Sequence, residues 1–374
     1  MNVYETDASE MKGKAKEIYL PETIEELQNI VRKENRILIR GGGSGLSGAV
    51  PDGDAVLSLE KLDRIAVDEG KRIAEVEAGV VLNNLNLELL KYNLEFPVDL
   101  SSGEIATIGG ILALNSGGSR EIRYGPALEW VKDMDIVDCY GQLKTIGILD
   151  LTDFIGMEGI TGVIVKARLK LIEKPKRTAV LLKTDEMNKI IEQVMKLKRI
   201  KEVSMAEFFD KEVSELVGWS RQYHLLVELE SDKGKLKDKD YEKVMETKEE
   251  VYQKLALIDY SRFDDVKLFI EKIPEFISWT EKNNLRVTGH IGKGLLRVYY
   301  MPSQKNLARE MIKVARKLHG KINVFGTGRK KKDFFDINDK KLIERIKRRY
   351  DPLWKFNRGI FVDYQGGENG KESI

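Results

Sequence analysis

Five glycines lie within eight residues between Gly41 and Gly48, directly after Arg40 and the apolar run 37–39. Because glycine has no Cβ, such a backbone can turn sharply, adopt positive φ angles and approach a ligand closely. Successive N–H groups in a turn of this kind form a concave nest for anions, and a neighbouring arginine adds donors suited to phosphate oxygens. The stretch therefore predicts a phosphate cradle for the pyrophosphate of a dinucleotide. A glycine-rich hairpin that binds nothing is the alternative.

The same stretch also matches the Rossmann pattern G-x-G-x-x-G, through Gly43, Gly45 and Gly48. That pattern identifies a dinucleotide site only where a helix opens at the last glycines. Here residues 51–53, Pro-Asp-Gly, predict a turn, and residues 55–59 predict a short strand. The order strand, loop, strand argues against a Rossmann site. A Walker P-loop would need Gly-Lys-Ser/Thr to follow, and the sequence does not have it.

Two further stretches are unusually rich in small residues. Residues 97–125 carry small and hydroxyl side chains with little helix or strand periodicity, which predicts a long functional loop. The apolar residues embedded in it argue against a flexible surface segment. A third glycine cluster, 156–162, runs into a predicted strand over 162–171, and residues 174–176 are typical of a domain boundary.

The composition fits a soluble globular protein of two domains. The 374 residues are 42% hydrophobic and 33% charged, and the net charge of +2 provides no bulk attraction for nucleic acid. The single cysteine, Cys139, excludes an intramolecular disulfide and a cysteine-based metal or iron–sulfur site. The sequence has no signal-like N-terminus and no run of 18 apolar residues, so we expect a cytoplasmic protein without a transmembrane segment.

The second half of the chain predicts an α+β sandwich in which helices cover one face of an antiparallel sheet. The expected strands are 179–183, 203–209, 224–230, 286–290, 295–301 and 322–325. The expected helices are 187–197, 241–255, 266–280 with a kink or division at Pro274, 306–318 and, last, 339–349. Two basic runs, 328–332 and 345–349, predict solvated faces, with a membrane or partner surface as the alternative.

The three glycine clusters, in this order, resemble the FAD-linked oxidases of the vanillyl-alcohol oxidase superfamily. Within that superfamily the chain is most similar to the glycolate oxidase and D-lactate dehydrogenase branch. The residues that carry the likeness are 6–9, 21–23, 40–48, 76–79, 106–110, 115, 123–125 and 156–162. The resemblance implies an α+β fold with four parts. These are a two-subdomain FAD-binding domain of the PCMH type over 1–176, an α+β sandwich substrate or cap domain over 177–338, a C-terminal segment over 339–364 that returns to the flavin domain, and a tail over 365–374.

The resemblance also implies an extended FAD, with its pyrophosphate on the first two clusters and its adenine end at the third. The residues implied to contact it are Arg40, Gly41, Gly42, Gly43, Ser44, Gly45, Leu46, Ser47, Pro97, Asp99, Ser101, Ala106, Thr107, Gly109, Gly110, Asn115, Gly117, Tyr124, Glu158, Gly159, Gly162, Val163, Ile164 and Asn357. Some relatives link the flavin covalently to a histidine just after the three glycines. Because Ser44 stands at that position, we expect FAD to be bound non-covalently.

The C-terminal half resembles the family less completely. Residues 206–210 and 225–230 are similar to the start of its substrate domain. Residues 351–359 resemble its closing Asp-Pro…Phe-Asn-Pro-Gly motif, with Arg358 in place of the second proline. The resemblance here supports the same overall architecture but leaves the substrate site open.

The histidine motifs of full-length relatives are largely missing. Those proteins carry His-x-Gly-Asp-Gly-Asn-x-His and, later, Glu-His-Gly. Here His290 is kept, Arg297 replaces the second histidine, and 324–326 reads Val-Phe-Gly where Glu-His-Gly is expected. We therefore expect no histidine-based metal site.

Oxidation of a 2-hydroxy acid needs a cation for the carboxylate, a base for the hydroxyl and an α-hydrogen aimed at the flavin N5. His290 is our candidate base, because an imidazole titrates near neutral pH and this one lies in a predicted turn between two strands. Arg297 could bind the carboxylate, and Tyr124 could face the flavin. A hydrogen-bonded structural role is the alternative for His290, and it is our interpretation of His224.

We therefore predict an FAD-dependent oxidoreductase that oxidises a small 2-hydroxy acid, such as D-lactate or glycolate, by hydride transfer to flavin N5. One alternative is a flavin subunit without its own substrate site, paired with a second flavoprotein or an iron–sulfur subunit. The shortened C-terminal half resembles the smaller flavin subunit of multi-subunit glycolate oxidase. Another alternative is a sugar or alditol oxidase on the same scaffold. The electron acceptor stays open, and so does attachment to the membrane surface.

Overall fold

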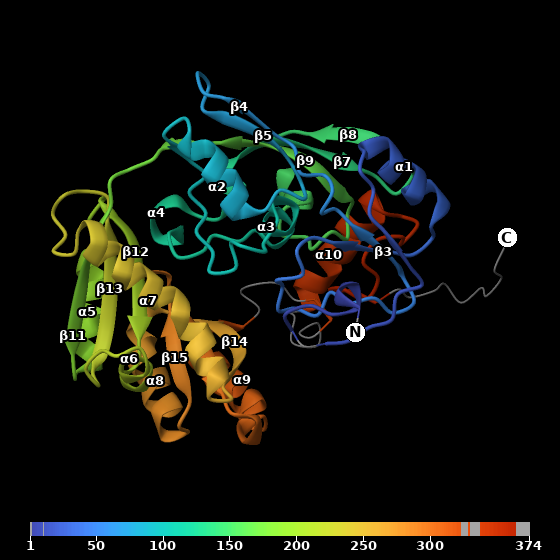
Figure 1. Ribbon diagram of the computed structural model, residues 1–374. Coiled ribbons are helices and arrows are strands. Elements are labelled where there is room, and N and C mark those ends of the chain that lie inside the picture. The colour runs from blue at the N-terminus through green and yellow to red at the C-terminus, as the bar shows by residue number, and fades with distance from the viewer. Residues whose placement is uncertain (1, 10, 323–327, 330–336, 364–374) are drawn as a thin grey trace.

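The computed structural model describes residues 2–9, 11–322, 328–329 and 337–363. Figure 1 shows two bodies side by side, the first built from the chain before residue 177 together with the C-terminal helix, the second from residues 178–322. Four features of the sequence fall outside the described residues. They are residues 323–325 of the predicted strand 322–325, the Val-Phe-Gly at 324–326, three residues of the basic run 328–332, and the tail 365–374.

The first body contains a small parallel sheet that carries the first glycine cluster. Its strands, in order across the sheet, are β1 (Glu17–Tyr19), β3 (Ala55–Ser58) and β2 (Ile37–Arg40). Helix α1 (Ile24–Lys33) begins after Thr23, whose side-chain oxygen accepts the backbone N–H of Glu26 at 3.1 Å. The glycine-rich loop leaves the sheet at the carboxyl end of β2.

A five-stranded antiparallel sheet forms the other part of the first body. Its strand order is β4 (Ile65–Asp68), β5 (Ile73–Glu77), β9 (Val163–Lys170), β7 (Val131–Val137) and β8 (Leu143–Ile146). Helices α2 (Leu82–Leu90) and α3 (Ile108–Leu114) lie on one face of this sheet in Figure 1. Their apolar side chains share one core with β5, β7 and β9. Two short strands, β6 (Leu94–Glu95) and β10 (Ile172–Glu173), pair separately.

The prediction of an irregular loop over 97–125 was wrong at its centre, where α3 forms. Thr107 caps this helix through its side-chain oxygen, and Asn115 ends it with a left-handed φ of 51°. Gly109 lies where an added Cβ would be 2.8 Å from the Ala78 Cβ, so the helix needs a glycine to pack this closely on the sheet. Glycine is a poor helix former, and its presence in the first turn hid the helix in the sequence.

The second body is built on a seven-stranded antiparallel sheet. The strand order is β11 (Thr178–Thr184), β13 (Tyr223–Leu229), β12 (Val203–Phe209), β15 (Arg286–Gly289), β16 (Leu295–Tyr300), β14 (Ser261–Lys267) and β17 (Lys321–Ile322). Its helices are α5 (Met187–Leu197), α6 (Lys211–Leu216), α7 (Asp238–Leu257), α8 (Ile273–Lys282) and α9 (Leu307–Lys317).

Helices cover both faces of this sheet, so the prediction of helices on a single face was wrong. On one face, α5, α8 and α9 bury side chains such as Ile190, Phe276 and Met311. On the other face, α6 and α7 bury Val213 and Val251. Strand β12 is apolar on both sides, as expected for a strand between two helical layers, and all seven of its residues are buried.

The predicted helix 266–280 was also wrong in its first half. Residues 261–267 form strand β14, and α8 begins only at Ile273. Pro274 lies in the first turn of α8, where its missing N–H would have no helical partner. The proline therefore starts the helix and does not kink it.

The end of the chain packs against the first body. Helix α10 (Ile337–Tyr350) lies beside β3 in Figure 1, and the segment after it reaches β2. The Ile37 N–H donates to the Lys355 carbonyl at 2.9 Å, and the Asn357 N–H donates back to the Ile37 carbonyl at 2.8 Å. Trp354 and Ile360 share a core with residues of β2 and β3. These contacts make the C-terminal segment part of the structure that supports the glycine-rich loop.

The remaining elements are short, and none of the described helices could cross a membrane. Helix α4 (Glu121–Tyr124) lies at the end of the stretch 97–125, and turns of 3-10 helix lie at Val3–Glu5, Ala127–Trp130, Leu151–Asp153, Ile270–Lys272, Ile291–Lys293 and Pro302–Gln304. No helix among the described residues is both long and apolar enough to span a bilayer.

Candidate functional site

The loop after β2 packs directly against the second cluster. A Cβ atom added at Gly41 would lie 2.5 Å from Thr107 Oγ1, and one added at Gly42 would lie 1.8 Å from the Ile105 carbonyl oxygen. Both distances are too short for real side chains, so only glycine permits the approach. The structure thus brings the first two predicted clusters together.

The backbone N–H groups of this loop have no acceptor among the described residues. Within the part of the chain that the structure describes, no protein acceptor receives a hydrogen bond from any N–H between Gly41 and Gly48. A Cβ added at Gly45 would meet no atom within 4 Å, so the loop faces open space there. Arg40 braces the loop by donating from Nη1 to the Thr6 carbonyl at 2.7 Å. N–H groups beside open space, with no partner in the described part of the chain, fit an anion such as a pyrophosphate.

The third cluster is tied to the first through Asn357. The Ile39 N–H donates to the Asn357 side-chain oxygen at 2.7 Å, and the Asn357 side-chain nitrogen donates to the Glu158 carbonyl at 2.6 Å. A Cβ added at Gly159 would lie 2.8 Å from that nitrogen. Asn357, predicted from the resemblance as a cofactor contact, therefore has both ends of its amide engaged by protein groups, and it positions the third cluster.

Two other predicted cofactor contacts also have protein partners. The Asn115 side-chain oxygen accepts the Leu128 N–H at 3.0 Å. Val163 is fully buried in the core that also holds Phe356. These two residues support the loops around the open space. Their assignment as cofactor contacts stays a prediction, as it does for the rest of the implied set.

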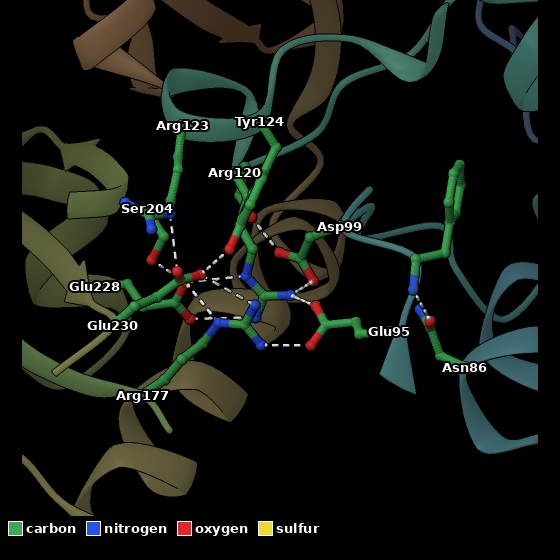
Figure 2. Close-up of polar contacts among 12 residues, drawn as sticks. Asn86, Glu95, Asp99, Arg120, Arg123, Tyr124, Arg177, Ser204, Glu228 and Glu230 are labelled. Carbon is green, nitrogen blue, oxygen red and sulfur yellow. Dashed lines mark hydrogen bonds and ion pairs between the residues drawn. The ribbon is translucent and has the colours of Figure 1, made fainter. Parts of the chain in front are cut away.

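A buried ionic network joins the two bodies (Figure 2). Arg120 pairs with Glu95 and with Glu228, both at 2.9 Å. Arg177, which directly precedes the second body, pairs with Glu95 at 2.7 Å and with Glu230 at 3.3 Å. The five side chains are between 0% and 12% exposed, so each charge depends on its partners.

Asp99, a predicted cofactor contact, lies at the edge of this network. Its carboxylate accepts a hydrogen bond from Ser119 and lies 3.6 Å from Arg120 Nη1 and 3.7 Å from Lys248 Nζ. Burial acts to raise the pKa of Asp99, but the charges of Arg120 and Lys248 outweigh it and the pKa falls below its usual range. Lys248, from α7, is itself buried, so Asp99 connects the first body to the centre of the second.

Tyr124 belongs to the same network. Its hydroxyl donates to Glu230, its ring centroid lies 5.6 Å from that of Trp130, and the Arg123 guanidinium lies 5.4 Å from its ring. Burial, followed by the Glu230 hydrogen bond, raises the pKa of Tyr124 to about 12, so it remains a donor at neutral pH. The structure therefore places Tyr124 in the contact between the bodies, and its predicted role beside the flavin stays a prediction.

A cavity of about 450 Å³ opens beside Tyr124. It is lined by residues of α4, of the end of α5, of the turn that follows and of the start of β12, namely Ile122, Arg123, Tyr124, Leu197, Lys198, Arg199, Ile200, Lys201 and Val203. His290 and Arg297 are not among its lining residues. The cavity is therefore separate from the two residues predicted to act on a substrate.

His290 and Arg297 converge on a third residue, Glu207. His290 Nδ1 contacts one oxygen of the Glu207 carboxylate, and Arg297 Nη1 donates to the other at 3.0 Å. Arg297 Nη2 contacts His290 Nε2, which closes the triangle. Glu207 comes from β12, His290 follows β15 and Arg297 lies in β16; since these strands are neighbours in the sheet, the register brings the three side chains to one place.

The protonation of this cluster follows from its burial and charges. Burial opposes the charge of Glu207, but His290 and Arg297 outweigh it and lower its pKa to about 2. Burial, followed by the charge of Arg297, lowers the pKa of His290 below its ordinary 6.5. At neutral pH the cluster therefore holds a carboxylate, a guanidinium and a neutral imidazole.

Sequence reasoning missed Glu207, Glu228 and Lys248. Glu207 and Glu228 are charged residues inside apolar strands, and each lies between two hydrophobic neighbours. A charge in such a setting is nearly always paired, and this signal could have identified both. Lys248 lies in a helix rich in charged residues, and nothing in its local sequence distinguishes it from exposed lysines.

Comparison with known proteins shows which family most of the first body matches. Residues 15–147 match the family described as FAD binding domain. The chain is 32% identical to a D-lactate dehydrogenase of Archaeoglobus fulgidus, over 56% of this chain and 53% of that protein. It is 31% identical to glycolate oxidase subunit GlcD of Bacillus subtilis, over 48% of this chain and 42% of that protein. These two alignments span about half the length of the relatives.

A more distant relative aligns over almost the whole chain. A D-lactate dehydrogenase of Anaerostipes hadrus is 27% identical over 94% of this chain and 91% of that protein. Together these matches confirm the resemblance that the three glycine clusters predicted, and they confirm FAD as the cofactor of the first body.

Proposed function

We propose that this chain oxidises a small 2-hydroxy acid. It is a homologue of FAD-linked 2-hydroxy-acid dehydrogenases, and its own residues 15–147 match an FAD-binding domain. The observation that carries the proposal is the buried cluster of Glu207, His290 and Arg297. It combines a neutral imidazole with a guanidinium, which are the base and the cation that a 2-hydroxy acid requires. Relatives named for D-lactate, D-2-hydroxyglutarate and glycolate support the substrate class without selecting one of its members.

The residues of the first body fit the cofactor. The free N–H groups between Gly41 and Gly48 would hold its pyrophosphate, and the approach of Gly41 and Gly42 to residues 105–107 shapes that cradle. When bound, FAD supplies the acceptor for the hydride that leaves the α-carbon. The third cluster, held by Asn357, would support the other end of the cofactor. We propose the two-subdomain arrangement and the boundaries 1–176, 177–338 and 339–364 on the same basis.

The second body would supply the groups that handle the substrate. Arg297 binds the carboxylate through its guanidinium donors and so fixes the orientation of the α-carbon. His290 accepts the hydroxyl proton at Nε2 as the α-hydrogen leaves, because its Nδ1 faces Glu207. The surrounding layers of α6, α7 and the sheet exclude water from the cluster, and His290 is only 4% exposed.

Anaerobic mixing of the purified flavoprotein with candidate acids tests this function. D-lactate, L-lactate, glycolate and D-2-hydroxyglutarate are each added, and flavin absorbance is followed near 450 nm. Reduction by at least one of them, seen as bleaching, is expected, and the acid that gives the fastest bleaching identifies the preferred substrate. Absence of bleaching by every acid, in a protein that contains flavin, would contradict the proposal.

Two other functions on the same scaffold remain open to this experiment. A flavin subunit that passes electrons to a partner is supported by the match to glycolate oxidase subunit GlcD, a protein named as a subunit. Such a subunit would not bleach with any acid alone and would co-purify with a second redox protein. A sugar or alditol oxidase would bleach with polyols and not with hydroxy acids.

Gly45→Val should leave the protein folded and lower its flavin content. A side chain at Gly45 meets no protein atom within 4 Å, so it would occupy the open space beside the free N–H groups. Overpacking of a ligand site by a few heavy atoms costs about 1–3 kcal/mol, which weakens FAD binding by about tenfold or more. The matched control is Gly147→Val, since a Cβ at Gly147 also meets no atom within 4 Å but lies in the turn after β8.

Acid precipitation measures the flavin content of the wild type and of both variants. The wild type and Gly147→Val should release equal amounts of yellow FAD into the supernatant, since Ser44 offers no histidine for a covalent link. Flavin retained in the protein pellet would contradict non-covalent binding. Full flavin content in folded Gly45→Val would contradict the assignment of the loop as the phosphate cradle.

A further inference from the structure

We propose that Arg297 masks the base His290 in the free protein, by which we mean that it donates a hydrogen bond to His290 Nε2 and so blocks the proton-accepting atom. A bound carboxylate draws Arg297 away from Nε2 and thereby unmasks the base. Glu207 contacts both side chains throughout and holds them in position. This inference rests on the proposed function, because it concerns the residues that would bind and oxidise a 2-hydroxy acid. It assigns Glu207 as a positioning residue. It also makes the base available only when the substrate's own charged group is present.

The contacts determine the tautomer of His290. An arginine side chain carries only hydrogen-bond donors, so the Arg297 Nη2 that contacts His290 Nε2 must donate to it. Nε2 is therefore an acceptor, and the ring proton lies on Nδ1, where it is donated to Glu207. The lone pair that would accept a substrate proton is occupied by the guanidinium.

Glu207 holds both partners from a rigid position. It lies in the middle of β12 and is 2% exposed, and its two oxygens serve different residues, one for His290 and one for Arg297 Nη1 at 3.0 Å. The guanidinium is thus held at one edge by Glu207, while its Nη2 touches the imidazole. The Arg297 Nε is buried and has no hydrogen-bond partner among the described residues, so this donor is unused in the resting arrangement.

A carboxylate bound near this guanidinium competes with His290 Nε2 for the hydrogen bond from Arg297 Nη2. It offers two acceptor oxygens to Nη2 and to the unused Nε, and a charged acceptor is stronger than the neutral Nε2. Nη1 can stay on Glu207 while the outer edge of the guanidinium turns to the ligand. The imidazole lone pair is then free. The neutralised guanidinium no longer disfavours an imidazolium, so the base becomes both accessible and stronger.

Among the residues that the structure describes, three charged groups act on His290, and only one of them moves in this scheme. Glu207 reaches it from β12, Arg297 from β16 and Lys248 from α7. Glu207 favours the protonated ring, while Arg297 and Lys248 disfavour it. Lys248 lies against Asp99 and Glu249 and keeps these partners, so the effect of a ligand on His290 passes through Arg297.

The test uses nuclear magnetic resonance of the FAD-loaded protein with isotope-labelled histidine. The chain has only three histidines, so each ring can be assigned from its His→Asn variant. The probe is oxalate, a carboxylate without an α-hydrogen, so the flavin stays oxidised. In the free protein His290 should be the neutral tautomer with its proton on Nδ1. Saturating oxalate should shift the Nε2 resonance and raise the pKa of His290 by about one unit or more.

The other two histidines are internal controls. His224 Nδ1 contacts Ser214 Oγ at 3.0 Å and the Gln222 carbonyl at 3.1 Å, and His319 lies at the end of α9. Neither ring should respond to oxalate. Equal shifts of all three would mean that oxalate acts on the protein as a whole, which would overturn the proposal.

Two variants separate unmasking from simple attraction between oxalate and the ring. Arg297→Gln removes the mask, so the pKa of His290 in the free variant should already be about one unit higher than in the wild type, and oxalate should not raise it further. Glu207→Gln removes the charged partner of Nδ1 and should give a mixture of the two tautomers. Arg286→Gln, which removes a charge from neighbouring β15, should leave His290 as in the wild type.

Several outcomes would overturn the proposal. They are an unchanged pKa of His290 in Arg297→Gln, a ring proton on Nε2 in the wild type, or a bound oxalate, seen in the flavin spectrum, that does not shift Nε2. Failure of oxalate to bind at 10 mM or so would also overturn it, because a carboxylate site would be saturated at that concentration. The histidine resonances are measured without any oxidation of substrate. Failure of every hydroxy acid to bleach the flavin would therefore contradict the proposed function even where the oxalate response is present.

Discussion

Replacing His290 by asparagine should slow substrate-dependent flavin reduction by about 10²–10⁴-fold while the protein keeps its FAD, because loss of a positioned general base has effects of that size. The asparagine side-chain NH₂ can still donate a hydrogen bond to the Glu207 carboxylate, so the cluster keeps a polar partner at this buried position. It cannot take up a proton. Stopped-flow absorbance of the bound flavin, measured with the acid that bleaches the wild type fastest, gives the rate directly.

The pH dependence of the wild type provides an independent check. The base acts in its neutral form, and burial together with Arg297 lowers the pKa of free His290 below 6.5. The rate of reduction at low substrate concentration should therefore fall as the pH drops through that lowered pKa, and it should be flat from about pH 7 to 8. In His290→Asn this acidic limb should disappear.

His224→Asn is the matched control. His224 is as buried as His290 and lies in the same sheet, but its Nδ1 is engaged by Ser214 and Gln222 in the layer near α6. Its replacement could reduce stability but should leave the rate of reduction and its pH dependence unchanged in the folded protein. Equal losses of rate in the two variants would show that His290 acts through the fold and not as a base.

The sequence predicted the first body well because its constraints are local. The apolar run 37–39, the glycines that follow it and the turn at 51–53 are each recognisable within a few residues. The approach of Gly42 to the Ile105 carbonyl explains why the glycines are required, and a backbone contact of this kind leaves a direct trace in composition. Helix α3 was not predicted because its first turn contains two glycines, which are poor helix formers, and one of them, Gly109, is needed for packing on Ala78.

The second body was harder to predict because its important features depend on pairing between distant strands. His290 and Arg297 were identified from residue type, but their meeting point, Glu207, lies 83 and 90 residues away in the chain. The register of β12, β15 and β16 decides that meeting, and no local pattern encodes a register. The same holds for Tyr124, whose partner Glu230 lies 106 residues away.

The mistaken placement of helices on one face has a similar origin. Strand β12 is buried on both sides, and its sequence, Val-Ser-Met-Ala-Glu-Phe-Phe, shows no clean alternation. Such a pattern indicates a strand that is covered on both faces. The strand's own sequence does not show which helices cover the second face, because α6 and α7 come later in the chain. Glu207 faces that second layer, so the error about the fold and the missed site residue have one cause.

Lys347→Met should destabilise the attachment of the C-terminal segment by about 3 kcal/mol, because removal of one partner leaves the other charge buried and unpaired. The Lys347 ammonium is 1% exposed, and it donates to the Ile160 carbonyl at 2.8 Å, to the Phe356 carbonyl at 2.7 Å and to Asp351 at 2.5 Å. Methionine matches its length but leaves the Asp351 carboxylate without a cation. Two backbone N–H donors still reach that carboxylate, which holds the expected loss to the lower end of the usual range.

Hydrogen exchange locates the effect of Lys347→Met. The Ile37 and Asn357 amides, which join β2 to the C-terminal segment, should exchange about 10²-fold faster than in the wild type. Lys341→Met, at an exposed position of the same helix, should change neither amide. Asn357 also holds the third glycine cluster through the Glu158 carbonyl, so the opened segment should weaken FAD binding in parallel. Faster exchange without weaker FAD binding would show that the C-terminal segment stabilises the sheet but does not support the cofactor site.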